Sequence, residues 1–323
     1  MKITVLDDYQ NFLQTLPCFA RLDGHVVASL TEHVRDPQAL ASRIAGSEAL
    51  LLIRQRTPIT RALIERLPQL RLISLSGPVP HIDMRACAEH GITVCSRIAP
   101  GGPSYATAEL AWGLVLAAWR RIPQEGAHLR SGRWQSAAAL GTTLRGKTLG
   151  IHGYGRIGAL VAGYGRAFGM RVMAWGGEGS RANAAGDDVE FAPDADTFYA
   201  ESDVVSLHLA LTPHTRSAVT RELLARMKPT ALFVNTSRAP LVERGALFEA
   251  LKRGQPGAAA LDVFDDEPAA PATEPLLSLP NVVATPHLGY VVREGLEAMF
   301  ETMVEQVLAY DRGTPVNVVP APV

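Results

Sequence analysis

Residues 150–177, GIHGYGRIGALVAGYGRAFGMRVMAWGG, contain the motif most informative about the fold class. Gly153, Gly155 and Gly158 have the spacing G-x-G-x-x-G and lie where an apolar run meets a helical pattern. In that context the first glycine makes a tight turn, and the second lets a pyrophosphate approach the backbone. The third lets the helix pack on the strand. The stretch therefore predicts a dinucleotide-binding βαβ unit. The alternatives are a glycine-rich turn without a ligand and an S-adenosylmethionine site.

Composition limits the class of protein further. The 323 residues suffice for two domains, and contents of 47% hydrophobic and 20% charged residues are typical of a soluble globular protein. The net charge of −1 provides no electrostatic attraction for nucleic acid or an anionic membrane. Three cysteines without a C-x-x-C pair indicate neither a disulfide framework nor a metal site. We expect a cytoplasmic location, no bound metal, no nucleic-acid partner and no membrane segment.

Two series of strand-like runs alternate with amphipathic helical patterns. The first includes KITVLDD (2–8) and ALLLIRQ (49–55), and the second begins at Lys147 and includes DVVSLHL (203–209). Alternation of this kind predicts βαβ units and mostly parallel, buried sheets. A long apolar helix is expected over residues 105–121 between the two series, and a last helix over residues 293–311. The chain therefore reads as two α/β domains.

Polar residues recur at the ends of three apolar runs in the second series. They occur in FVNTSRAP (233–240), ALDVFDDEP (260–268) and VVATPHLGY (282–290). Ligands of open α/β sheets bind beyond the carboxyl ends of the strands, so chemistry is expected there. Arg238 is a candidate for binding an anion or polarising a carbonyl, or is a solvated surface charge. Glu267 and His287 form a candidate acid/base pair, or a polar turn and a hydrogen-bonded loop histidine.

The combination of motifs resembles one family, the D-2-hydroxyacid dehydrogenases, which include D-3-phosphoglycerate dehydrogenases. The resemblance covers nearly the whole chain and is densest from about residue 108 to residue 290. The motifs that carry it are GYGRIG (153–158), SLHLALTPHTR (206–216), MKPTALFVNTSRAPLV (227–242), ALDVFDDEP (260–268) and NVVATPHLGY (281–290).

The resemblance implies an α/β fold of two doubly wound parallel-sheet domains, Rossmann-like and flavodoxin-like. A dinucleotide-binding domain, residues 103–289, would be inserted into a discontinuous substrate domain, residues 1–102 and 290–323. It also implies a homodimer formed through the helix at 105–121. Trp112 and Trp119 on that helix are then either interface anchors or core residues.

The implied activity is hydride transfer between a nicotinamide cofactor, NAD or NADP, and a D-2-hydroxy acid or 2-oxo acid, with 3-phosphoglycerate-like substrates included. In the reduction direction His287 would donate a proton to the carbonyl oxygen, and Glu267 would stabilise the charged imidazole. Arg238 would hold the substrate carboxylate and polarise the carbonyl. The alternative is a nucleotide-sensing binding protein of the co-repressor type, built on the same fold, without efficient turnover.

The resemblance also assigns the residues that would line the cofactor and the substrate. Asp262 would hold the nicotinamide carboxamide, and Arg54, Val79 and Arg238 would bind the substrate. The implied cofactor-binding residues are Gly153, Tyr154, Gly155, Arg156, Ile157, Gly158, His208, Thr212, Thr236, Ser237, Arg238, Asp262, His287 and Gly289.

The chain departs from the family pattern at the adenosine end of the cofactor. Gly176 stands where members that use NAD usually carry an aspartate. Glu178 is a candidate substitute for that acid, whereas Ser180 and Arg181 are candidates for contacting a 2′-phosphate. The preference between NAD and NADP therefore stays open. We expect Gly176→Asp to shift the preference towards NADH by roughly 1–3 kcal/mol.

A second departure concerns the substrate turn, SGPVPHID (76–83). Pro78 stands where a glycine is usual and His81 where an asparagine is usual, and a proline has no N–H to donate. The amide of Val79 is still available as a donor. Arg54 matches a family position near the substrate anion, or is a solvated charge after a strand. The identity of the 2-hydroxy acid therefore stays open.

Overall fold

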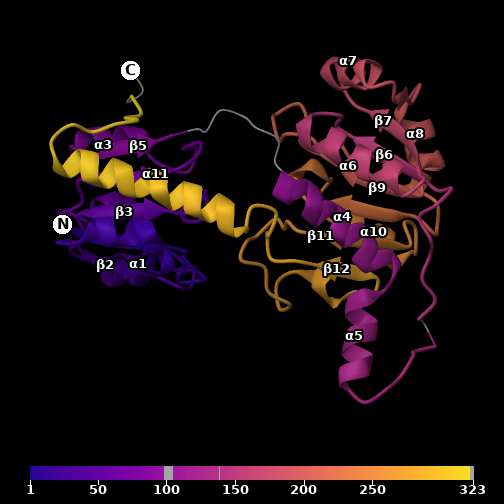
Figure 1. Cartoon of the computed structure of the whole chain (residues 1–323), viewed down its shortest axis with the longest axis horizontal. Coiled ribbons are helices and arrows are strands. Elements are labelled where there is room, and N and C mark those ends of the chain that lie inside the picture. Colours follow the sequence, from indigo (N-terminus) through magenta and orange to yellow (C-terminus); the bar gives the residue numbers. More distant parts are fainter. Residues whose placement is uncertain (98–104, 138, 321–323) are drawn as a thin grey trace. The chain divides into compact units, whose positions relative to one another are not determined.

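The computed structural model describes residues 1–97, 105–137 and 139–320, which form two compact units (Figure 1). One unit comprises Met1–Gly102 with Val292–Val323, and the other comprises Pro103–Val291. The expected domain boundary at residues 102–103 lies outside the described residues. The second unit ends at Val291, where the sequence suggested residue 289.

The first unit is built on a five-stranded parallel sheet in the order β2-β1-β3-β4-β5. This is the flavodoxin-like order of a doubly wound fold. Its strands are β1 (Lys2–Leu6), β2 (Val26–Ser29), β3 (Ala49–Leu52), β4 (Leu72–Leu75) and β5 (Thr93–Ser96). Its helices are α1 (Pro37–Arg43), α2 (Arg61–Ile64), α3 (Met84–Glu89) and α11 (Arg293–Asp311), with short 3-10 turns η1 (Leu13–Thr15) and η2 (Pro17–Leu22).

The last helix returns to this first unit. The helix α11 has the bounds that the sequence suggested, and it packs against β4. The hydroxyl of Ser74, buried in β4, donates to the backbone carbonyl of Met303 on α11 at 3.2 Å. Figure 1 shows α11, in yellow, lying along the elements of the N-terminal unit. The first unit is therefore discontinuous in sequence.

The second unit contains a seven-stranded parallel sheet in the order β12-β11-β10-β9-β6-β7-β8. Numbered from its own first strand, this is the Rossmann order 3-2-1-4-5-6 with one further strand at the edge. The strands are β6 (Thr148–His152), β7 (Arg171–Trp175), β8 (Glu190–Phe191), β9 (Val204–Leu207), β10 (Leu232–Asn235), β11 (Ala258–Leu261) and β12 (Val282–Ala284). The predicted fold class is confirmed.

Helices cover the seven-stranded sheet of the second unit (Figure 1). The glycine-rich turn lies between β6 and α6, beside β9, where the strand order reverses. The helices are α4 (Tyr105–Trp119), α5 (Ile122–Arg130), α6 (Arg156–Ala167), α7 (Glu178–Gly186), α8 (Ala195–Glu201), α9 (Arg221–Arg226) and α10 (Ala246–Lys252), with 3-10 turns η3 (Ala239–Leu241) and η4 (Pro275–Ser278).

Both tryptophans of α4 belong to the core of this unit. Trp112 is 7% exposed and Trp119 is 8% exposed. The ring of Trp112 meets that of Phe168 edge-on, with the centroids 5.0 Å apart. The interpretation of these two residues as interface anchors is therefore wrong, because packing within the chain already covers them.

Three further observations bear on the composition-based expectations. The three cysteines are free and buried. Among residues 1–97, 105–137 and 139–320, no helix combines the length and apolar character needed to cross a bilayer. Within the same ranges, no group of three or more His, Cys, Asp or Glu residues is arranged to hold a metal ion.

Candidate active site

The glycine-rich turn is shaped by close backbone packing at two of its glycines. Gly153 has φ +99°, and a Cβ there would lie 2.8 Å from the carbonyl carbon of His208. A Cβ on Gly158 would lie 2.5 Å from the carbonyl oxygen of Gly153. A Cβ on Gly155, in contrast, would have no atom within 4 Å. Two glycines are therefore required for packing, and the third leaves the approach to the backbone open.

Backbone amides at the start of α6 form the anion-binding end of this turn. Gly155 is the N-cap of α6 and has no side chain that could satisfy the first helical amides. Its own N–H donates to the carbonyl of Gly153 at 2.9 Å, and the N–H of Tyr154 donates to Ser180 Oγ at 3.1 Å. The amides of Arg156 and Ile157 therefore remain as the donors that a pyrophosphate would meet.

The other residues predicted to line the cofactor differ in whether their polar side chains already have hydrogen-bond partners within the chain. Thr212 hydrogen-bonds Thr215 within its own loop, and Ser237 Oγ donates to the carbonyl of Leu207 at 2.7 Å. His208 Nε2 lies 2.8 Å from Ser206 Oγ. Thr236 Oγ1 is buried and has no hydrogen-bond partner among the described residues. This orphaned hydroxyl, together with the open approach at Gly155, fits a dinucleotide along the carboxyl edge of the sheet.

His287 and Glu267 are in direct contact. His287 Nδ1 lies 2.6 Å from Glu267 Oε2, with the two side chains 24% and 23% exposed. The second carboxylate oxygen of Glu267 accepts from the backbone N–H of Phe264 at 3.0 Å, which fixes the orientation of the carboxylate. Because Nδ1 contacts Glu267, Nε2 is the ring nitrogen that can exchange a proton with a substrate. The geometry is that of a base and its orienting carboxylate.

Asp262 anchors the loop that carries His287. It is fully buried at the end of β11 and accepts from Thr285 Oγ1 at 2.6 Å, Leu288 N at 2.7 Å and Gly289 N at 2.9 Å. Burial raises the pKa of the Asp262 carboxyl, whereas these three donors oppose the rise. The sequence suggested only a contact with the nicotinamide. This anchoring role depends on backbone amides that come close only in the folded loop.

Arg238 follows β10 at the same edge of the sheet. The strands β10, β11 and β12 are parallel neighbours, so the residues after them meet at one edge of the sheet; β11 and β12 are labelled in Figure 1. The Arg238 side chain is exposed, and its Nη1 donates to the carbonyl of Ser237 at 2.7 Å. Asn235 braces the turn, because its Nδ2 donates to the carbonyl of Arg238 at 3.0 Å.

Arg54 and Val79, the other predicted substrate residues, belong to the first unit. They follow the neighbouring parallel strands β3 and β4, and Arg54 has φ 59°. The carbonyl of Pro78 accepts from Gln55 Nε2 at 3.0 Å, which ties the two loops together. Both ring nitrogens of His81 are buried without a partner among the described residues, and burial lowers the pKa of His81.

The geometry at Gly176, at the adenosine end of the turn, contradicts the expected effect of Gly176→Asp. Gly176 has φ +149°, and a Cβ there would lie 2.7 Å from Ser180 Oγ. Asp at this position would be strained in its backbone and would displace Ser180, so Gly176→Asp alone is not expected to favour NADH. Arg181, a candidate for a 2′-phosphate, has its guanidinium 4.2 Å from the centroid of the Phe191 ring.

Two histidines lie next to the glycine-rich turn, where the strand order of the sheet reverses: His152 ends β6 and His208 directly follows β9. His152, 5% exposed at the end of β6, has Nδ1 3.0 Å from the hydroxyl of Tyr199. Burial lowers the pKa of His152 to about 4. Burial, together with neighbouring His152, lowers the pKa of the half-buried His208 to about 4. Both imidazoles are therefore neutral at neutral pH.

The depressed pKa of His152 predicts acid sensitivity. An unfolded histidine binds a proton near pH 6.5, so between about pH 6.5 and 4 the unfolded state binds more protons than the folded state. The free energy of unfolding therefore decreases as the pH is lowered through this range. We expect a loss approaching ~1.4 kcal/mol per pH unit for this group. His152→Gln should flatten that slope in urea unfolding measured from pH 7.5 to 4.5. An unchanged slope would mean that His152 does not supply it.

Comparison with known proteins shows which family and which relatives this chain resembles. A family model described as D-isomer specific 2-hydroxyacid dehydrogenase, NAD binding domain, matches residues 112–289. A D-3-phosphoglycerate dehydrogenase of Methanocaldococcus jannaschii is 41% identical over 265 residues, 82% of this chain and 50% of that protein. The chain thus spans about half the length of this relative. A hydroxypyruvate reductase of Thermotoga maritima is 37% identical over 279 residues, 86% of this chain and 89% of that protein.

A solved structure agrees over almost the entire length. The crystal structure of a phosphoglycerate oxidoreductase from Vibrio cholerae O395 superimposes with a TM-score of 0.91 and 46% sequence identity. The match covers 97% of this chain and 99% of the other.

Proposed function

Because the chain belongs to the D-isomer specific 2-hydroxyacid dehydrogenase family, we propose that it transfers a hydride between a nicotinamide dinucleotide and a 2-oxo or D-2-hydroxy acid. The observation that carries this proposal is the contact of 2.6 Å between His287 and Glu267. This pair lies in the same unit as the open glycine-rich turn and its two amides.

Each residue at the strand ends has a task in this reaction. The bound cofactor supplies or accepts the hydride. His287 Nε2 gives a proton to the carbonyl oxygen during reduction and takes it back during oxidation. Glu267 stabilises the charged imidazole and fixes its orientation. Arg238 holds the substrate carboxylate with two parallel hydrogen bonds and polarises the carbonyl. Asp262 keeps the His287 loop in place, with capacity on Oδ2 for a further donor from the carboxamide.

The substrate class follows from the names of the relatives. These are a D-3-phosphoglycerate dehydrogenase, a hydroxypyruvate reductase and glyoxylate reductases. We propose that the substrate is one of these small 2-oxo or 2-hydroxy acids. The test mixes the protein with NADH or NADPH and each of glyoxylate, hydroxypyruvate, 3-phosphohydroxypyruvate and pyruvate, and follows the absorbance of the reduced cofactor. Binding of cofactor without turnover of any acid would favour the co-repressor type of binding protein.

The role assigned to Glu267 gives a second prediction. Glu267→Gln keeps the size of the side chain but removes the negative charge beside the imidazole. We expect kcat/KM for reduction to fall about 10- to 100-fold, the scale of one charge-assisted hydrogen bond, with little change in cofactor affinity. Steady-state kinetics with a responsive 2-oxo acid measure this. Asp266→Asn, a neighbouring loss of the same charge, is the control. Equal effects in both variants would show that the charge at Glu267 has no special role.

The cofactor preference follows from the adenosine end. With Gly176 and no acid side chain at that position, nothing there repels a 2′-phosphate, so we propose that both NADH and NADPH bind. Fluorescence titration of the two nucleotides tests this. Strong discrimination against NADPH would contradict it.

A homodimer is supported by exposed apolar side chains on α5 and the segment that follows it. Ile122 and Leu129 are each 58% exposed, Trp134 is 78% exposed and Leu140 is 93% exposed. Figure 1 shows α5 extending beyond the sheet of its own unit. Large apolar side chains with this much exposure are typical of a protein–protein contact. Light scattering of the wild-type chain and of a Trp134→Ser, Leu140→Ser variant tests this, and a monomeric wild-type chain would refute it.

We place the protein in the cytoplasm, where its three free cysteines would stay reduced.

A further inference from the structure

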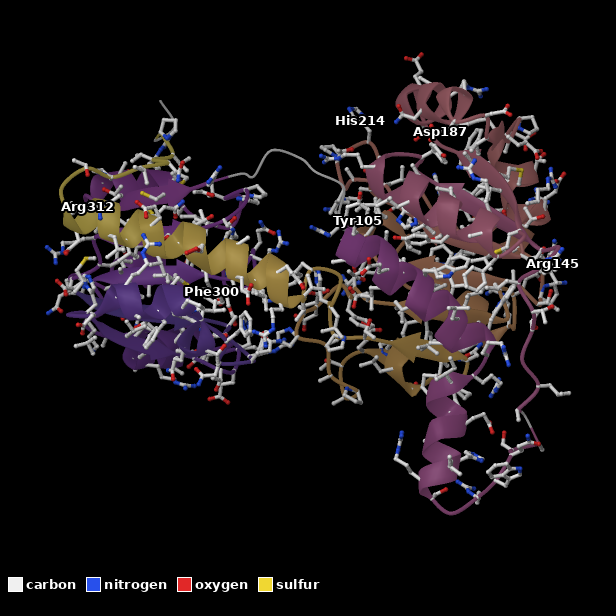
Figure 2. All side chains as sticks on the ribbon, in the orientation of Figure 1. Tyr105, Arg145, Asp187, His214, Phe300 and Arg312 are labelled. Atoms are coloured by element: carbon white, nitrogen blue, oxygen red, sulfur yellow. The ribbon has the colours of Figure 1, made fainter. Side chains whose placement is uncertain are left out.

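Tyr154, between the first two glycines of the turn, is held by α7 at three points. Its N–H donates to Ser180 Oγ at 3.1 Å, and its carbonyl accepts from Asn183 Nδ2 at 3.1 Å. Its hydroxyl donates to Asp187 Oδ2 at 2.9 Å. The three partners are spaced by three and four residues, so they lie on one face of the helix and its C-cap. Figure 2 labels Asp187 at this end of α7.

The Tyr154 side chain connects α7 to the core of this unit. It is fully buried and belongs to the core cluster that contains α4 and α6 residues. Burial, followed by the contact with Asp187, raises the pKa of Tyr154 to about 12, so the hydroxyl remains a donor at neutral pH. The glycine spacing places no requirement on the residue at this position. A buried tyrosine with three partners on one helix is therefore a feature of this chain rather than of the turn alone.

The helix α7 is itself fixed to the sheet by a second set of contacts. The guanidinium of Arg181 lies 4.2 Å from the centroid of the Phe191 ring in β8. The Phe191 ring in turn lies 5.8 Å from that of Trp175 in β7, the residue directly before Gly176. Because α7 is anchored to the sheet in this way, its contacts with Tyr154 restrain the glycine-rich turn.

We propose that Ser180, Asn183 and Asp187 are positioning residues for the cofactor and act through Tyr154. Ser180 occupies the N–H of Tyr154, so the turn offers the amides of Arg156 and Ile157 to the pyrophosphate instead. A turn held in this geometry before binding loses less conformational freedom when the dinucleotide arrives. This inference rests on the proposed function, since it requires that the turn bind a nicotinamide dinucleotide.

The test is a double-mutant cycle on NADH binding, measured by fluorescence titration of the full chain. Tyr154→Phe and Asp187→Ala are each expected to raise the Kd for NADH about tenfold, the scale of one hydrogen bond to a charged group. The double variant should bind no more weakly than either single variant, because both remove the same contact. Asp187→Asn keeps an acceptor oxygen and should restore most of the affinity. Asp188→Asn, which removes a neighbouring charge without a Tyr154 contact, is the matched control.

Kinetics and stability separate positioning from a purely structural role. The change should fall on the KM for NADH rather than on kcat at saturating NADH, since Arg238, Glu267 and His287 lie in the loops after β10, β11 and β12, away from α7 in sequence. Variants that bind NADH like the wild type, with only a lower Tm, would overturn the positioning role. Additive effects in the double variant would overturn it as well. A wild-type chain that bound neither NADH nor NADPH would overturn the proposed function, and the positioning role with it.

Discussion

Replacing His287 with alanine is expected to lower kcat/KM for reduction of the responsive 2-oxo acid by about 10²- to 10⁴-fold, the range of a positioned general acid. Nδ1 of this imidazole is held by Glu267 at 2.6 Å, so its other nitrogen is the group poised to give the proton. The loss should persist across pH, because alanine cannot be protonated. Affinity for NADH should change little, since the glycine-rich turn and α6 are not altered.

The measurement pairs initial rates with an NADH titration. His90→Ala, an exposed histidine of the first unit, is the control for loss of an imidazole. Turnover by His287→Ala within a few-fold of the wild-type rate would exclude His287 as the acid. A parallel loss of NADH binding would instead assign it a role in holding the cofactor.

Arg238→Lys is expected to lower kcat/KM by about 10²-fold while keeping the positive charge. A lysine cannot form the two parallel hydrogen bonds that a guanidinium makes with a carboxylate, and loss of one such donor to a reacting oxygen has this scale. The backbone of the turn should survive the change, because Asn235 braces it through main-chain atoms of residues 237 and 238.

The control is Arg244→Lys, an exposed arginine six residues further along the same segment. Its rate should equal that of the wild type. Wild-type activity in Arg238→Lys would make Arg238 a solvated surface charge, which its exposure in the folded chain also allows.

The features predicted from sequence are those that local chemistry specifies. The glycine spacing between a strand and a helix predicted the Rossmann unit, because the first and third positions of that turn have no room for a side chain. Polar residues after buried strands predicted that Glu267 and His287 lie together, since parallel strands end at one edge. The roles of Arg238, Asp262 and Thr236 towards ligands remain predictions.

Other features depend on packing between segments far apart in sequence. The pattern of α4 did not distinguish core from interface tryptophans, because only the packing of Phe168 and Tyr164 against Trp112 decides this. From sequence alone, Gly176 indicates only the absence of an acid at that position. The conflict of a side chain there with Ser180 arises from the way α7 folds back on the turn.

Chiral analysis of the product distinguishes a D-2-hydroxyacid dehydrogenase from a protein that only binds the cofactor. The wild-type chain is incubated with one equivalent of the preferred reduced cofactor and a responsive 2-oxo acid whose product is chiral, such as hydroxypyruvate, 3-phosphohydroxypyruvate or pyruvate, and the acid products are separated by chiral chromatography. The proposed function predicts one molecule of the D-2-hydroxy acid for each molecule of cofactor oxidised, and no product with His287→Ala. Racemic product, the L enantiomer, or cofactor binding without any 2-hydroxy acid across the substrate panel would contradict it.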